Sequence, residues 1–231
     1  MLRLGLIGGM SWESSALYYR LINEGVAEAL GGLHSADCLL LSVDFARVET
    51  MQAQGLWEEA AALLAAAARD LQAGGAEVLV LCTNTMHKVA EQIEAAVDIP
   101  LLHLADATAK EAQAQGMERV GLLGTAFTME QDFYVSRLRS HGLDVIVPNA
   151  ADRSLVHRVI YDELCLGEVR SESRQEYLRI ITGLAGDGAD GVILGCTEIE
   201  LLVSQEDCPV PLLPTTRLHA AAAVRHMLGS R

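Results

Sequence analysis

Two sequence motifs each occur twice in this 231-residue chain, and this repetition constrains the fold more than any other feature. A glycine motif, Gly5-Leu-Ile-Gly8, returns as Gly121-Leu-Leu-Gly124. An apolar run that ends in Cys82-Thr83 returns, after nearly the same interval, as a run that ends in Cys196-Thr197. Because both motifs recur at a similar spacing, we interpret the chain as a duplication. We therefore expect two lobes of similar size and fold.

Short apolar runs alternate with helical patterns along the chain. The runs are apolar almost continuously, which is typical of parallel strands covered on both faces. Between them, apolar residues recur with helical spacing, as in residues 17–30 and 56–71. Alternating strands and helices indicate βαβ units, so the sequence predicts an α/β fold with parallel sheets. The expected strands cover residues 4–7, 38–43, 78–81, 120–123, 145–147 and 192–194.

The repeats also predict where the lobes divide. We expect a first lobe of residues 1–104 and 205–231 and a second lobe of residues 105–204. The short apolar run 212–213 and a helix over 218–228 follow the second repeat, and we expect both to return to the first lobe. The chain would then cross between the lobes twice.

Charge and cysteine content limit the partners and the compartment. The formal net charge is −14 and Lys and Arg form no cluster, which argues against nucleic acid as a partner. No apolar run is long enough to cross a membrane, so we expect no membrane partner and a cytoplasmic location. The five cysteines match no zinc spacing, so we expect free thiols and no metal site.

Cys82 and Cys196 are the most informative cysteines, because each ends an apolar strand, precedes a threonine and comes before a helix. Ligands of open parallel sheets bind at the carboxyl ends of the strands. Two related lobes that face each other would bring the two thiols to opposite walls of one interlobe cleft. Since a helix N-terminus favours the thiolate, we expect partly lowered pKa values for both thiols.

Inversion of a Cα–H centre needs such a pair, because a base removes the proton from one face and an acid returns one to the other. The α-carboxylate and the developing carbanion need hydrogen-bond donors, which backbone amides and hydroxyls at helix starts could supply. The chain has no Walker-type phosphate loop and no dinucleotide fingerprint, so we expect no cofactor. The residues expected to contact substrate in this way are Ser11, Thr83, Asn84, Thr85, Thr125 and Thr197.

Three segments resemble signatures of the aspartate/glutamate racemase family: 8–14, 82–87 and 195–199. The resemblance covers nearly the whole chain. It implies two flavodoxin-like lobes related by pseudo-twofold symmetry, an active site in the cleft between them, an amino-acid substrate, no cofactor and a homodimer. It further implies Cys82 and Cys196 as the catalytic acid and base. Arg47, Met10 and Gln52 lie in or near matching segments, and the resemblance implies that they contact the substrate.

One position departs from the family pattern and leaves the substrate open. Some aspartate-acting members have a lysine just after a Glu-Leu pair, where this chain has Cys165. Arg47 is then the main candidate to bind a distal carboxylate, and the substrate could be aspartate, glutamate or a broader set. Two alternatives remain. One is a related cysteine-dependent isomerase or decarboxylase of a small carboxylic acid, and the other is a non-catalytic two-lobe protein that binds an amino acid.

Several residues near these motifs also have ordinary structural interpretations. Cys38, Cys165 and Cys208 are typical of small packing or loop residues. His87 could orient a thiolate, but a histidine at such a position more often packs or lies on a helix surface. Glu198 could tune the thiol of its neighbour or could only favour the start of a helix.

Overall fold

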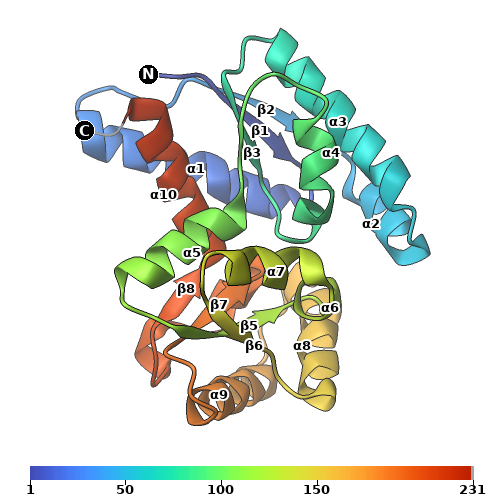
Figure 1. The fold of residues 1–231 in the computed structure, drawn as a ribbon, viewed down its shortest axis with the longest axis vertical. Helices are drawn as coiled ribbons and strands as arrows, with labels where there is room; N and C mark the ends of the chain where they lie inside the picture. Colours follow the sequence, from blue (N-terminus) through green and yellow to red (C-terminus); the bar gives the residue numbers. More distant parts are fainter. Residues whose placement is uncertain (230–231) are drawn as a thin grey trace. The chain divides into compact units, whose positions relative to one another are not determined.

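We describe residues 1–229 of the protein from a computed structural model. This part of the chain forms two compact units (Figure 1). Unit 1 contains Met1–Leu104 and the chain from His219 onward, and unit 2 contains Ala105–Leu218. Among the helices of the described residues, none is both long enough and apolar enough to span a bilayer.

Unit 1 is built on a four-stranded parallel sheet in the order β2-β1-β3-β4. Ile7 of the second strand in this order pairs with Leu41 on one side and with Leu81 on the other, so three strands end at the same edge. The strands are β1 (Leu4–Gly8), β2 (Cys38–Ser42), β3 (Val78–Leu81) and β4 (Leu101–Leu102). The helices between them are α1 (Trp12–Leu30), α2 (Phe45–Gln54), α3 (Trp57–Ala73), η1 (Thr85–Val89) and α4 (Ala90–Glu94).

Two apolar clusters cover the two faces of this sheet. Side chains alternate between faces along a strand, so Leu79 and Leu81 join the cluster under α3, while Val78 and Val80 join the cluster under α1. Both faces are buried, which explains why the strands are apolar almost continuously. Cys82 continues the row of Val78 and Val80 and therefore belongs to the α1 face.

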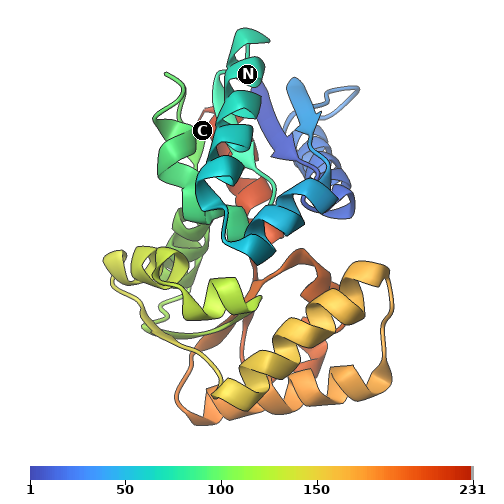
Figure 2. The ribbon, with the colours of Figure 1, turned by 90° about the vertical axis from the view of Figure 1, so that its right-hand side faces the viewer.

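Unit 2 repeats the same topology, with a parallel sheet in the order β6-β5-β7-β8. Helices α8 and α9 lie side by side in this unit (Figure 2). The strands are β5 (Arg119–Gly124), β6 (Asp144–Ile146), β7 (Gly191–Gly195) and β8 (Leu212–Pro214). The helices are α5 (Leu104–Ala114), α6 (Ala126–Glu130), α7 (Asp132–Ser140), α8 (Ala150–Asp162), η2 (Leu164–Leu166), α9 (Ser171–Gly186), η3 (Thr197–Leu201), η4 (Gln205–Asp207) and α10 (Thr215–Leu228). The chain passes between the units within α5 and again within α10.

The α/β prediction, with two similar parallel sheets, is confirmed by these topologies. The sequence-based division of the lobes is wrong for residues 205–218, which we expected in the first lobe. Strand β8 pairs with β7 through Val192 and Leu212, and this pairing places the segment in unit 2. The chain returns to unit 1 only at His219, within α10.

Candidate active site

Cys82 follows β3 directly and is fully buried on the α1 face of the unit 1 sheet. Its amide donates a hydrogen bond to the carbonyl of Ile7 at 2.9 Å, which extends the β1–β3 ladder by one residue. Its Sγ lies 3.9 Å from the carbonyl of Val80. Burial raises the pKa of the Cys82 thiol, and the nearby thiol of Cys38 adds to the rise.

Hydrogen bonds of three serines connect the turn after β1 to the backbone of Cys82. Gly9 has a φ of +92°, and its amide donates to Ser15 Oγ at 2.7 Å. Ser15 Oγ in turn donates to the carbonyl of Ser11 at 2.8 Å, while Ser14 Oγ donates to the carbonyl of Cys82 at 3.4 Å. Ser11 itself caps α1 by accepting from the Ser14 amide at 3.3 Å. The start of α1 therefore holds both the glycine turn and the backbone of Cys82.

Met10 and Thr85, both expected to contact substrate, are buried beside these turns, and the peptide bond between Met10 and Ser11 is cis. Thr83 follows Cys82, and its carbonyl accepts a hydrogen bond from the His87 ring. Asn84 is also buried, and among the described residues its side-chain carbonyl oxygen has no hydrogen-bond donor. A buried acceptor without a donor is costly unless a ligand or water satisfies it. Of these side chains, Asn84 is thus the best prepared to accept a hydrogen bond from a bound molecule.

Arg47 and Gln52 lie on α2 but have different surroundings. Arg47 is exposed, and no acidic side chain of residues 1–229 forms an ion pair with it. Gln52 is buried, and its side-chain amide donates to Met86 Sδ at 3.0 Å. Gln52 thus packs α2 against η1, whereas the Arg47 guanidinium remains available to an anion.

Cys196 occupies the equivalent place in unit 2, directly after β7. Its thiol donates to a carboxylate oxygen of Glu198 at 2.9 Å. Burial raises the pKa of the Cys196 thiol, and the Glu198 carboxylate and the Cys165 thiol raise it further. The thiol of Cys165 therefore acts on the candidate catalytic thiol of unit 2.

The threonines of unit 2 serve as caps and links. Thr125 caps α6, where its Oγ1 accepts from the Thr128 amide at 3.4 Å. Thr197 Oγ1 lies 2.8 Å from Thr216 Oγ1, and Thr215 Oγ1 donates to the carbonyl of Leu194 at 2.8 Å. Sequence reasoning missed Thr215 and Thr216. The sequence did hold one signal for them, because both follow the short apolar run 212–213, which lies in β8, and polar residues at strand ends are candidates for a site.

The expected lowering of the thiol pKa values is wrong for both cysteines. The segments that follow Cys82 and Cys196 are short 3₁₀ turns, η1 and η3, so little helix dipole acts on either sulfur. Cys82 is fully buried and Cys196 is half-buried, and the neighbours that raise their pKa values, Cys38 and Glu198 among others, are negatively charged when ionised. Each environment therefore favours the neutral thiol over the thiolate.

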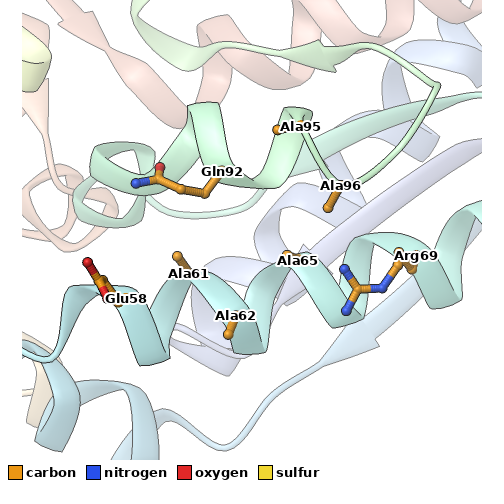
Figure 3. A pocket seen from close by; sticks show the side chains of 8 residues that line it. All are labelled: Glu58, Ala61, Ala62, Ala65, Arg69, Gln92, Ala95 and Ala96. Carbon is orange, nitrogen blue, oxygen red and sulfur yellow. The ribbon is translucent and has the colours of Figure 1, made fainter.

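A separate groove of about 410 Å³ lies in unit 1 between α3 and α4 (Figure 3). Alanines such as Ala61, Ala65 and Ala95 line its middle, and along α3 Glu58 lies on one side of these alanines and Arg69 on the other. None of its lining residues is a cysteine or histidine. Glu58 is the one acidic side chain among its lining residues and has no second acid or base opposite it, so the strand-end cysteines remain the candidate catalytic groups.

The sheets and strand-end cysteines define a class of protein, an α/β protein with two four-stranded parallel sheets of the Asp/Glu racemase two-lobe fold. A profile of the family described as Asp/Glu/hydantoin racemase matches residues 7–223. The chain therefore belongs to the Asp/Glu/hydantoin racemase family.

Solved structures and a curated protein are similar to the chain. A crystal structure described as a candidate Asp/Glu racemase from Yersinia pestis is 55% identical, with a TM-score of 0.95, and the match covers 99% of this chain and 100% of that one. An aspartate racemase homologue from Pyrococcus horikoshii is 32% identical, with a TM-score of 0.87 and the same coverage. The broad-specificity amino-acid racemase RacX of Bacillus subtilis is 22% identical over 69% of this chain and 68% of its own length.

Proposed function

We propose that the protein is a cofactor-independent amino-acid racemase in which Cys82 and Cys196 act as acid and base. One observation carries the proposal. Each unit has the strand order 2-1-3-4, and in each unit the third strand of that order is followed by a Cys-Thr pair. A duplicated fold that keeps one thiol at the same place in each half suits a reaction that needs one proton donor or acceptor on each face of a carbon atom.

The chemistry follows from the protonation states that the two environments favour. In one direction, the Cys196 thiol passes its proton to Glu198 and the resulting thiolate removes the Cα proton of the substrate. The Cys82 thiol then donates its proton to the opposite face of the carbanion and becomes a thiolate. A proton returns from Glu198 through solvent to Cys82 and restores the starting state. In the reverse direction, the Cys82 thiolate removes the proton and the Cys196 thiol returns one.

Two side chains support an amino acid with an acidic side chain as the substrate. The Asn84 side-chain oxygen, buried and without a donor among residues 1–229, suits the ammonium group. The Arg47 guanidinium, which has no acidic partner among the same residues, suits a distal carboxylate. Aspartate and glutamate are therefore the first substrates to test, followed by neutral amino acids because RacX is a broad-specificity enzyme.

Proton NMR in deuterium oxide would test the proposal, with the reduced full-length protein and a panel of L- and D-amino acids. We expect loss of the α-proton signal together with growth of the opposite enantiomer on chiral chromatography. Cys82→Ser and Cys196→Ser should each abolish racemisation. Cys208→Ser is the matched control, because this half-buried thiol lies outside both strand-end motifs.

Lack of exchange with every amino acid, by a protein with an intact fold, would overturn the proposal. The chemistry would then point to an isomerase or decarboxylase of another carboxylic acid. Binding of an amino acid that survives both cysteine substitutions, without exchange, would point to a binding protein. The homodimer, the cytoplasmic location and the absence of a cofactor stay predictions, which sedimentation, cell fractionation and mass analysis of the native protein would check.

A further inference from the structure

Unit 1 contains a cluster of three buried histidines that the proposed reaction does not use. His87, His103 and His219 are 3%, 8% and 0% exposed. The ring centroids of His87 and His103 lie 4.6 Å apart, and those of His87 and His219 lie 5.8 Å apart. Tyr18 of α1 contacts the His219 ring edge-on at 5.6 Å. The three imidazoles come from η1, from the link between β4 and α5, and from α10.

The hydrogen bonds of His87 determine where its proton lies. Its Nδ1 is 2.8 Å from the carbonyl of Thr83, which can only accept, so Nδ1 carries the proton. Its Nε2 is 3.2 Å from the amide of Leu104, which can only donate, so Nε2 carries none. Both bonds exist together only when the ring is neutral. His87 thereby joins the residue after Cys82 to the last residue of unit 1 before the first crossing.

His219 makes the corresponding link at the second crossing. It is the first residue of unit 1 after the chain leaves unit 2. Its Nε2 donates to the carbonyl of Leu102 at 2.8 Å, and its Nδ1 lies 2.9 Å from the Tyr18 hydroxyl. Leu102 and Leu104, which flank His103, are therefore each held by one imidazole. The unit 1 residues next to the two crossings, Leu104 and His219, are therefore linked through hydrogen bonds and ring contacts of this cluster.

The groups around His87 oppose a positive charge on its ring. Burial lowers the pKa of His87, and the His103 and His219 rings lower it further. Tyr18 from α1 contacts the His219 ring, while His103 from the β4–α5 link and His219 from α10 contact the His87 ring, and none of these three side chains is a carboxylate. Among residues 1–229, no group of three or more His, Cys, Asp and Glu side chains could hold a metal ion. A structural role is therefore favoured over a metal site.

We propose that these three histidines form a clasp in which neutral His87 is a positioning residue, holding the Cys82–Thr83 turn and both chain crossings together. Acid that protonates His87 breaks the bond from Leu104, because Nε2 then carries a proton of its own. The clasp exists whatever reaction the protein catalyses. Only its effect on turnover rests on the proposed function.

Long-range proton–nitrogen NMR of the full-length, ¹⁵N-labelled protein would test the clasp directly. We expect His87 to show the neutral Nδ1–H form at pH 7 and to resist protonation well below the ordinary histidine pKa of roughly 6.5. Amide exchange at Leu104 should be about tenfold faster in His87→Ala, which corresponds to the loss of one hydrogen bond. A proton on Nε2 at pH 7, or protonation of His87 at an ordinary histidine pKa of roughly 6.5, would overturn the proposal.

Two further variants separate the clasp from the catalytic proposal. His87→Gln can donate to Thr83 and accept from Leu104 without titrating, so it should keep Leu104 protected and retain that protection in acid. His34→Gln, at an exposed site, should behave as the wild type. If the protein proves to be no racemase, these exchange measurements still decide the clasp. If it is a racemase, His87→Ala should lower kcat more than His87→Gln does, and equal kcat values would contradict the positioning role.

Discussion

The Sγ atom of Cys196 lies 2.9 Å from a carboxylate oxygen of Glu198, whereas the Sγ of Cys82 has only the carbonyl of Val80 within hydrogen-bonding reach among the described residues. The two strand-end thiols thus occupy equivalent places in the fold but different chemical environments. One has a carboxylate that can take its proton, and the other is enclosed by apolar side chains. This asymmetry leads to the first prediction.

Glu198→Gln should affect Cys196 in two ways that can be measured separately. Loss of the carboxylate charge should lower the pKa of the Cys196 thiol, because that charge raises it in the wild type. Loss of the proton acceptor should lower kcat roughly 10²- to 10⁴-fold, as is usual when a general base is removed. Alkylation rate against pH measures the first effect and steady-state kinetics the second. Glu206→Gln, at an exposed site in η4, is the control. If Glu198→Gln changes neither the pKa of the Cys196 thiol nor kcat, Glu198 has only a structural role.

Cys165→Lys should lower the pKa of the Cys196 thiol, because it replaces a group that raises this pKa with a cation. Cys165→Ser separates the loss of the thiol from the gain of charge and should shift the pKa less. Thiolate absorbance during a pH titration, with Cys196→Ser as the reference, measures both. If the lysine variant titrates like the serine variant, the charge at position 165 does not reach Cys196.

The histidine clasp predicts a loss of stability in acid. The pKa of His87 is lower in the folded protein than in the unfolded chain, so its contribution is complete above the unfolded value of roughly 6.5. As the pH falls below that value, the unfolded chain binds a proton that the folded protein does not. The free energy of unfolding should then fall by about 1.4 kcal/mol per pH unit for this one group. Urea unfolding at several pH values between about pH 5 and pH 7.5 gives the free energy of unfolding at each pH. This free energy should depend less steeply on pH in His87→Gln than in the wild type, and an equal dependence would contradict the prediction.

Gly9→Ala should destabilise the protein far more than Gly55→Ala does. Both glycines have positive φ values, +92° and +71°, and the left-handed conformation of Gly55 costs a residue with a Cβ about 1–2 kcal/mol. At Gly9 the added Cβ would also lie 2.1 Å from the carbonyl oxygen of Val43, whereas nothing lies within 4 Å of it at Gly55. Urea unfolding should therefore give a loss of several kcal/mol for Gly9→Ala and about 1–2 kcal/mol for Gly55→Ala. Equal losses would mean that the turn after β1 relaxes freely.

The sequence alone determined the class of fold. Apolar runs and helical stripes depend on residues close together in the chain, so they predicted two parallel α/β sheets, and both were found. The repeat placed Cys82 and Cys196 at the ends of strands for the same reason. The two-residue strand β4 carried too little pattern to be predicted, and the pairing of β8 with β7 depended on a contact that the sequence does not encode locally.

Only the tertiary structure decided the environment of each site. The pKa of a buried thiol depends on everything packed around it, so a local rule about helix starts predicted the wrong direction for Cys82 and Cys196. His87, His103 and His219 form one cluster although the last lies more than a hundred positions from the others, since three separate elements meet there. Local pattern determines which elements form, because it sets hydrophobic period and backbone preference. Long-range packing decides which polar groups meet and how strongly each is desolvated, and these contacts determine the chemistry.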